Sequence, residues 1–140
     1  MIETFIDGIS ESLHSEFGDE YTIYTEAVKQ GLQKPCFFVY CISPDTSQYM
    51  GMRYERLYQF VIHYFPKTDA SNHEFNNVIE RLQECLEYIT ADDDLHRGVD
   101  MDSAIDVDAL HFFVNYHFFV NKLEDSVPME DLEQIVRTGG

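Results

Sequence analysis

The sequence has 140 residues, and its 44% hydrophobic and 14% aromatic content excludes the low hydrophobicity of disordered chains. It carries 26 acidic against 9 basic residues, a formal net charge of −17. Nucleic acid and anionic membranes bind proteins mainly through Lys and Arg, so this charge disfavours both as partners. Two interpretations of the charge stay open: simple solubility, or a surface that must repel DNA.

The three cysteines form no C-x-x-C pair and have no histidine at zinc-ligand spacing, which predicts reduced thiols in a cytosolic protein. The N-terminus carries acidic residues where a signal peptide carries basic ones. No apolar run approaches the roughly 18 residues that cross a bilayer. We therefore expect a soluble protein made in the cell interior.

The first element is an amphipathic helix over residues 2–17. Gly18 follows it at the position where a left-handed residue commonly ends a helix. The apolar stripe at helical spacing comprises Ile2, Phe5, Ile6, Ile9, Leu13 and Phe17.

Three strand-like segments follow. Residues 21–28 are rich in β-branched and aromatic side chains, and 36–42 form a continuous apolar run of the kind found in buried central strands. Residues 57–65 make the next strand, expected to pair antiparallel with 36–42 because a parallel return usually needs a crossover helix. The intervening residues 43–56 are irregular, and predict either a loop or a long hairpin arm reaching out of the sheet.

The second helix begins with a capping box, in which Ser71 is the N-cap and Glu74 the third helical residue. An apolar stripe then runs to Ile89 and is followed by the acidic residues 92–94. We expect the helix to continue as far as this stripe. The stripe comprises Phe75, Val78, Ile79, Leu82, Cys85, Leu86 and Ile89.

Residues 99–121 predict a β-hairpin with its turn at 107–109. Its first arm alternates apolar residues with aspartates, and its second arm is the most aromatic stretch of the chain. The alternation places Val99, Met101 and Ile105 on one face. It places Asp100, Asp102 and Asp106 on the other, a face open to solvent.

Together these segments predict an α+β fold in which two helices pack on one face of a mostly antiparallel sheet of about five strands. The expected order is helix, three strands, helix, two strands. Residues 1–123 form the domain, and residues 124–140 form a C-terminal arm that orders only on assembly.

Catalytic and metal-binding patterns are not met. The aspartates of 100–108 lack the third ligand and the Gly of an EF-hand loop. His63, His111 and His117 lie on strands and could meet across the sheet, but sequence does not place them on one face. The cysteines sit in apolar segments, and no Gly-rich phosphate loop is present. We therefore expect no enzyme, no catalytic residue, no cofactor and no metal.

Two segments are typical of contact surfaces, because large adaptable side chains are enriched in interface cores. The first lies in the irregular segment 43–56 and is expected to make axial contacts in an assembly. It comprises Tyr49, Met50, Met52, Arg53 and Tyr54. The second is a clasping arm formed by Leu132, Ile135 and Val136.

Several phrases in collinear order make the chain resemble the phage tail terminator family, small proteins encoded among the tail genes of Firmicutes phages and prophage-like elements. They are IDGIS (6–10), EFGDEY (16–21), IYTEAVKQGLQKPCFF (23–38), RYER (53–56), FVIHYFP (60–66), CLEYIT (85–90) and LHFFVNYHFFV (110–120). The resemblance covers most of the chain and weakens after Glu124.

The resemblance implies a compact α+β subunit that assembles as a hexameric ring and caps the head-proximal end of a tail tube. Such a ring ends tube polymerisation and, in contractile tails, meets the last sheath ring and the head connector. In headless contractile particles it would close the tube as a collar. The implied partners are further copies of itself, the tube protein, the sheath and the connector, in the host cytoplasm and then in the particle.

Two other function classes stay open. One is a small acidic inhibitor or DNA mimic, which would be monomeric or dimeric. The other is an enzyme whose site is assembled between subunits. For the ring, an acidic lumen would let DNA slide past, and Asp100, Asp102 and Asp106 are the residues expected to face the lumen or solvent.

Overall fold

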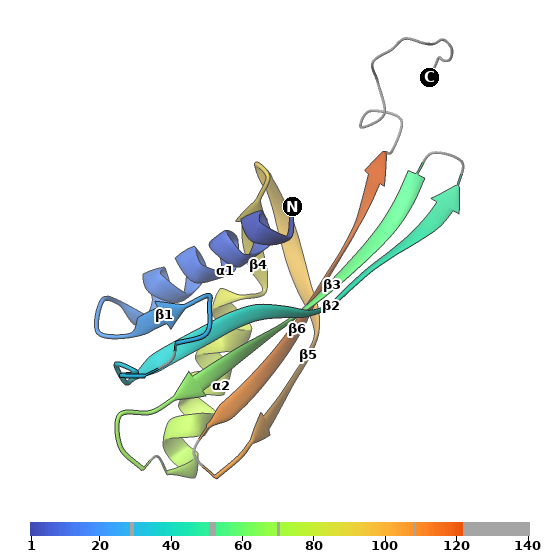
Figure 1. The fold of residues 1–140 in the computed structure, drawn as a ribbon. Helices are drawn as coiled ribbons and strands as arrows, with labels where there is room; N and C mark the ends of the chain where they lie inside the picture. Colours follow the sequence, from blue (N-terminus) through green and yellow to red (C-terminus); the bar gives the residue numbers. More distant parts are fainter. Residues whose placement is uncertain (29, 51–52, 70, 108, 122–140) are drawn as a thin grey trace.

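The computed structural model describes residues 1–28, 30–50, 53–69, 71–107 and 109–121 (Figure 1). In chain order its elements are α1 (Ile2–Phe17), β1 (Thr22–Tyr24), β2 (Cys36–Met50), β3 (Arg53–Phe65), α2 (Asn72–Cys85), β4 (Tyr88–Ala91), β5 (Asp94–Ile105) and β6 (Leu110–Asn121). The α+β prediction with two helices is confirmed. The expected order has two strands after the second helix, whereas the structure has three, β4, β5 and β6.

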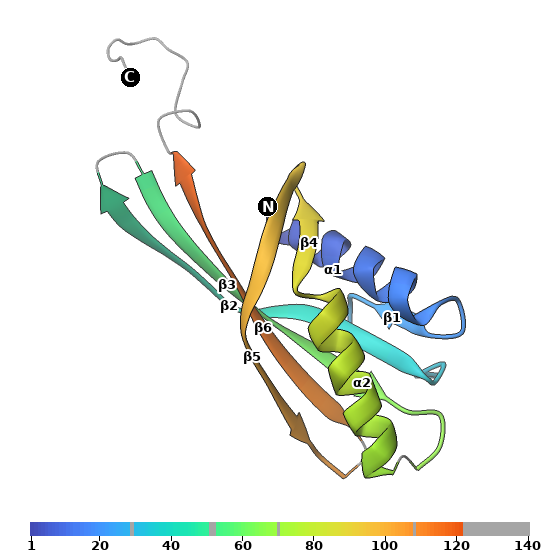
Figure 2. The ribbon, with the colours of Figure 1, turned by 180° about the vertical axis from the view of Figure 1, so that it is seen from behind.

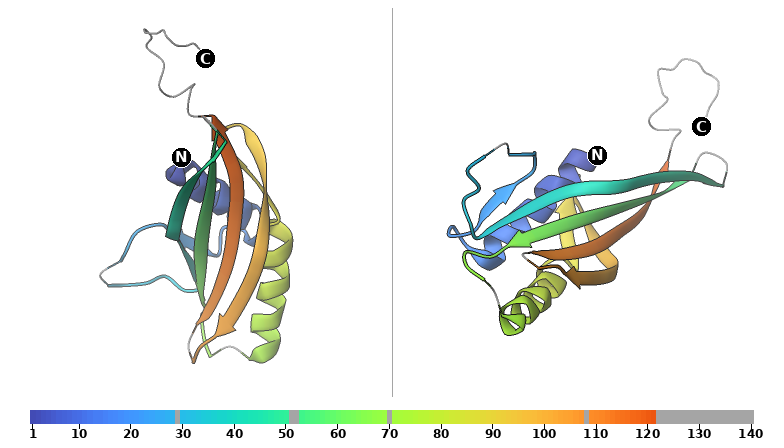
Figure 3. Two further views of the ribbon diagram at one scale, coloured as in Figure 1. Left: turned by 90° about the vertical axis from the view of Figure 1, so that its right-hand side faces the viewer. Right: turned by 60° about the horizontal axis from the view of Figure 1, so that its bottom comes forward.

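The strands form one curled sheet in the order β1-β2-β3-β6-β5-β4. β1 and β2 are parallel, and every other neighbouring pair is antiparallel. The first strand is shorter than the expected 21–28, because the chain leaves the sheet after Tyr24. Figures 2 and 3 show both helices on the same side of the sheet.

Helix α1 matches the predicted range 2–17 and ends at Gly18, whose φ of 89° is left-handed. Its stripe buries Phe5, Ile9 and Leu13 completely. The helix also approaches β4 closely, since a Cβ added to Gly8 would lie nearer than 3.0 Å to a backbone oxygen of that strand. Neither of the described helices is long and apolar enough to span a membrane.

The core forms between the helices and the alternate side chains of the central strands. Phe112, Val114 and Tyr116 of β6 are each fully buried there. The Tyr116 hydroxyl donates a 2.7 Å hydrogen bond to the backbone oxygen of Leu86, so its one polar atom is satisfied inside the core. Phe5 lies at the centre of this aromatic cluster, with its ring 5.1 Å from that of Phe118 on β6.

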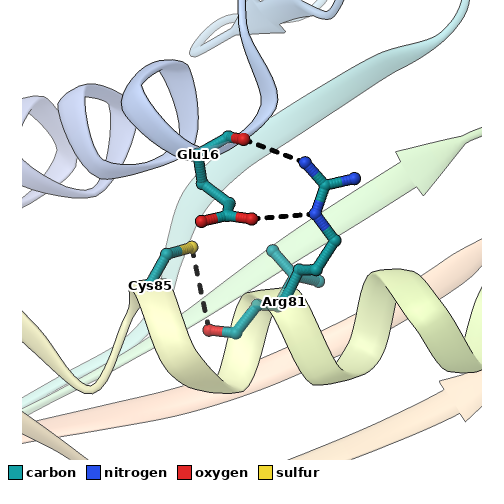
Figure 4. A network of polar contacts seen from close by, with 4 residues as sticks. Glu16, Arg81 and Cys85 are labelled. Atoms are coloured by element: carbon teal, nitrogen blue, oxygen red, sulfur yellow. Dashed lines mark hydrogen bonds and ion pairs between the residues drawn. The ribbon is translucent and has the colours of Figure 1, made fainter.

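Helix α2 begins at the predicted N-cap, where the Ser71 hydroxyl accepts a hydrogen bond from the Glu74 N–H at 3.3 Å. The Glu74 carboxylate accepts from the Tyr64 hydroxyl at 2.9 Å. Figure 4 shows how α2 is fastened to α1: Arg81 donates to the Glu16 carboxylate at 2.8 Å and to its backbone oxygen at 2.9 Å. The guanidinium also lies 4.2 Å from the centre of the Phe17 ring.

The expected extension of α2 to Ile89 is wrong. The helix ends at Cys85, and Ile89 belongs to β4, which pairs with the start of β5. Asp92 and Asp93, with φ of 54° and 66°, make the two-residue turn between these strands. Both φ values are positive, as a type I′ hairpin turn requires, and Asp adopts this conformation more readily than most residues.

Residues 43–50 and 53–56 of the irregular segment form the two strands of the long hairpin arm, the second of the two predicted alternatives. Residues 43–50 of β2 pair with β3, for example Thr46 with Arg56. β6 pairs with β3 as far as Asn121, which lies opposite Arg53. The pairing of β5 with β6 ends earlier, at Gly98 opposite Tyr116. We call residues 43–50, 53–57 and 117–121 the blade. Figure 1 shows the blade extending away from the helices.

The blade has two strand edges with no paired strand among the described residues. β1 covers β2 only at residues 36–38, so the outer edge of β2 is open beyond that point. β6 is open beyond Tyr116 on the side away from β3. Pro44, opposite Tyr58, lies within the open part of β2, and proline in a sheet is confined largely to such edges.

Candidate assembly surfaces

The sheet face opposite the helices, here called the outer face, carries large side chains. Directly paired residues point to the same side, so the pairs Phe38–His63 and His63–His111 place these three rings on that face. Tyr40 and Phe113 follow on the same side, because both pair with Val61. Tyr40 is 38% exposed, which leaves an aromatic surface uncovered by either helix.

His63 and His111 meet across β3 and β6 with ring centres 4.2 Å apart and nearly perpendicular planes. The Tyr40 hydroxyl lies 3.2 Å from Nε2 of His63. Burial lowers the pKa of His63, and the positive charge that His111 can carry lowers it further. Both effects favour the neutral form of the His63 ring. A carboxylate oxygen of Asp106 lies 3.9 Å from His111.

The third strand histidine does not join this pair. His117 faces the same side but lies on the blade, where its Nε2 contacts the carboxylate of Glu55. Within the described ranges, no three His, Cys, Asp or Glu side chains gather in a way that could hold a metal ion.

A hollow of about 530 Å³ opens where the chain after β1 folds beside the outer face. A second hollow of about 620 Å³ adjoins it and shares Leu32 and Phe65 with it. We call the two together the groove. Its first part is lined by Val28, Leu32, Phe38, Tyr40, His63 and Phe65, among others. Its second part adds Lys34, Pro66, Lys67, Asp69, Phe75 and Val107.

Two of the predicted axial residues, Arg53 and Tyr54, begin β3 at the end of the blade. Arg53 is exposed, and its guanidinium lies 4.5 Å from the centre of the Phe119 ring. Tyr54 is partly buried and pairs with Val120. Tyr49 and Met50 belong to β2, but their side chains lie outside the described part of the structure, as do Met52 and the arm residues Leu132, Ile135 and Val136.

The three predicted acidic residues are all exposed. Asp102 pairs with Phe113 and so stands on the outer face, while Asp106 accepts a 2.8 Å hydrogen bond from the Val107 N–H in the β5–β6 turn. A β-bulge between Val99 and Asp102 interrupts the alternation, with Asp100 at φ 53°. The predicted shared face of Val99 and Met101 is therefore wrong: Met101 packs against the core, but Val99 pairs with Asn115 on the outer face.

Two of the cysteines are placed as structural thiols. Cys36 is fully buried, and burial raises its pKa. Burial, with the Glu16 carboxylate nearby, raises the pKa of Cys85 to about 12, and its thiol donates weakly to the Leu82 oxygen at 3.9 Å (Figure 4). Thiols of this kind stay protonated and are poor nucleophiles.

Sequence reasoning missed the outer face and the groove. The continuous apolar run at 36–42 was interpreted as a strand buried on both sides, which holds for sheets covered on both faces. Here both helices lie on one side, so Phe38 and Tyr40 of that run stay uncovered. One signal in the sequence could have found the outer face. This run and residues 57–65 carry aromatic or histidine side chains at both odd and even positions, so such side chains point to both faces of the sheet.

Comparison with known proteins places the chain in a family. A search of curated proteins finds no match. The family model described as phage tail terminator protein matches residues 4–128, which is most of the chain and includes every described helix and strand except the first residues of α1. The earlier resemblance is thereby confirmed: the chain belongs to the phage tail terminator protein family, whose members are structural proteins of phage tails.

Proposed function

We propose that this protein forms a ring, hexameric in its complete form, that caps the head-proximal end of a tail tube. The ring ends polymerisation of the tube, and of the sheath where the tail is contractile. It then joins the tail to the head connector or, in a headless particle, serves as the collar. Family membership supports the tail role. The ring and its position are what the family resemblance implies, and the shape of the subunit supports a ring.

The observation that carries the ring is the blade. It projects from one side of the subunit, and the described residues form no such projection on the opposite side (Figures 1 and 2). Its open β2 edge and the outer face beside it are different surfaces from the helix-covered side. A contact between two unlike surfaces is head-to-tail, and repeated head-to-tail contacts close into a ring when the rotation permits.

Capping follows from the same asymmetry along the ring axis. We place the blade tip against the tube, because it presents an arginine and an aromatic ring in a chain that is otherwise strongly acidic. Arginine and aromatic side chains are enriched among residues that dominate binding energy at interfaces. The end opposite the tip is formed by the start of α2 and the end of β5 (Figure 1). The described residues form no second tip there, so we infer that this end does not template another tube ring.

The exposed carboxylates suit a passage for DNA. Asp102 on the outer face and Asp106 at the β5–β6 turn have no basic partner among the described residues, apart from the histidine near Asp106. If this part of the subunit lines the lumen, it repels phosphate and lowers the friction of passing DNA. Burial of these carboxylates against Lys or Arg of a neighbour would contradict the lumen assignment.

The experiment that tests the proposed function removes the protein from particles that normally carry it. In its absence we expect tail tubes of uncontrolled length. In a separate preparation that carries a tagged subunit, we expect electron microscopy to locate the tag at one tail end. Light scattering on the purified chain measures its mass alone and with tubes. A stable monomer that binds a DNA-binding protein and never associates with tails would favour the acidic-inhibitor alternative and refute the ring.

A paired substitution tests the blade tip. Arg53→Glu reverses the charge at the tip, and we expect it to reduce attachment to tubes by more than tenfold, as loss of an interface arginine commonly does. Arg97→Glu is the matched control, because this exposed arginine lies on β5 and contacts Glu87 at 3.7 Å. Equal attachment of the two variants would show that the tip does not touch the tube.

A further inference from the structure

We propose that the blades of neighbouring copies join edge to edge, with residues 45–50 of β2 in one copy pairing with residues 117–121 of β6 in the next. We call this contact the seam. The inference rests on the proposed function, because it assigns the contact between subunits of the proposed ring. It starts from the two blade edges that have no paired strand among the described residues. Such an edge presents a row of backbone N–H and C=O groups that can take up a further strand.

The two free edges lie at the same level of the blade. Residues 53–57 of β3 pair on one side with residues 45–50 of β2 and on the other side with residues 117–121 of β6. Copies in a ring are related by rotation, which moves no atom along the ring axis. Edges that meet in a ring must therefore lie at one level along that axis. A blade whose tip points along the axis towards the tube meets this requirement.

The two edges also run in the same direction. β2 and β6 are each antiparallel to β3, so they are parallel to one another. Rotation about the ring axis preserves the direction of a strand along that axis. β2 of one copy therefore meets β6 of the next as a parallel pair, and the outer face of one blade continues into the outer face of its neighbour.

A second copy of this chain is the occupant that leaves neither edge open. The two edges lie on opposite sides of one three-stranded sheet, so they cannot pair with each other within a copy. A two-fold dimer through β2 would leave both β6 edges free. A closed ring of blades removes every free edge, in the way that closing a barrel does.

Pro44 confines the seam to the far part of β2. Proline in a sheet lies with its nitrogen towards the free edge. The alternation along an antiparallel strand then directs the backbone N–H groups of Thr46 and Gln48 to the same edge, before a bulge between Gln48 and Met50 interrupts the register. A strand pair this short is marginal by itself, so we expect the seam to persist where several seams close a ring.

Cysteine cross-linking between two singly substituted full-length chains tests the seam. Asp45 and His117 both pair with Leu57, so they lie at one level and on one face of the blade. One chain carries Asp45→Cys, the other carries His117→Cys, and the mixture is oxidised with and without tail tubes. Paired strands lie close enough for a disulfide to span them. Leu95→Cys, 68% exposed on β5, replaces Asp45→Cys in the control mixture, and the parent chain reports cross-linking of native cysteines.

We expect mixed dimers severalfold above those of the control mixture, and only background dimers when either chain is oxidised alone. Thr46→Pro removes one N–H from the free edge and spares the pairing with β3, so it should weaken association about fivefold for each seam. Thr46→Ala keeps that N–H and is the matched control. Circular dichroism of both variants checks that the subunit stays folded.

Mixed dimers no more abundant than in the control mixture overturn the inference. Dimers of the Asp45→Cys chain with itself, as abundant as the mixed ones, also overturn it, because they indicate a two-fold contact through β2. If tail ends carry the protein without the mixed disulfide, the proposed function stands and the seam falls. If the mixed disulfide forms but no tail end carries the protein, the seam stands and the proposed function falls.

Discussion

Gly8 lies where α1 crosses β4, and replacing it with alanine sets two effects of opposite sign against each other. In a helix interior, Gly→Ala raises stability by about 1 kcal/mol through backbone entropy. Here the new Cβ would lie nearer than 3.0 Å to the Thr90 backbone oxygen, and backbone cannot swing aside. The helix must lift away, and Phe5 and Ile9, both fully buried, must lift with it.

Overpacking of this kind costs about 1–3 kcal/mol, and the fully buried neighbours place Gly8 at the upper part of that range. After the propensity gain is subtracted, Gly8→Ala should lower the free energy of unfolding by about 1–2 kcal/mol. Urea denaturation followed by far-UV circular dichroism measures this at low protein concentration. The pair Ser15→Gly and Ser15→Ala, at an exposed position of α1, measures the propensity effect alone. A Gly8→Ala protein as stable as the parent would refute the close approach of α1 to β4.

Three further substitutions test other parts of the fold. Tyr116→Phe leaves the Leu86 oxygen without its donor inside the core, so unfolding free energy should fall by about 1–2 kcal/mol in the same assay. Ser71→Ala removes the N-cap of α2 and should cost about 1 kcal/mol, whereas Ser71→Asp should retain the cap. Because the pKa of His63 lies below its ordinary value of 6.5, the folded state resists protonation, and stability should fall as pH drops through 6.5. His63→Gln should flatten that slope, and an unchanged slope would assign it to other groups.

The sequence predicted elements wherever local pattern and tertiary packing agree. The helix at 2–17 has one apolar stripe and is followed by a glycine with positive φ, so both signals that define it are local in the sequence. The N-cap at Ser71 needs no distant partner either. The antiparallel pairing of 36–42 with 57–65 was predictable because a parallel return usually needs a crossover helix, and residues 43–56 do not predict one.

The sequence-based prediction failed where the same spacing of apolar residues fits both a helix and a strand. Leu86 and Ile89 continue the helical stripe of α2, yet Ile89 and Ala91 also alternate with Tyr88 and Thr90 as a strand does. The two aspartates after Ala91 settle the choice by taking positive φ, which shows only in three dimensions. The groove was beyond prediction for a different reason. Its walls come from the segment after β1, from β2 and β3, from α2 and from the β5–β6 turn, and no local pattern shows that these meet.

Pro44 gives the open edge of β2 a consequence for how the protein behaves when concentrated. An exposed strand edge recruits the edges of other molecules, and uninterrupted recruitment produces stacked sheets that precipitate or form fibres. A proline breaks the row of N–H donors on such an edge, so an incoming strand cannot pair along its full length. Pro44→Ala should therefore leave the subunit folded but prone to thioflavin-positive aggregates on storage. We therefore expect the native proline to keep subunits dispersed in solution although the β2 edge has no paired strand among the described residues.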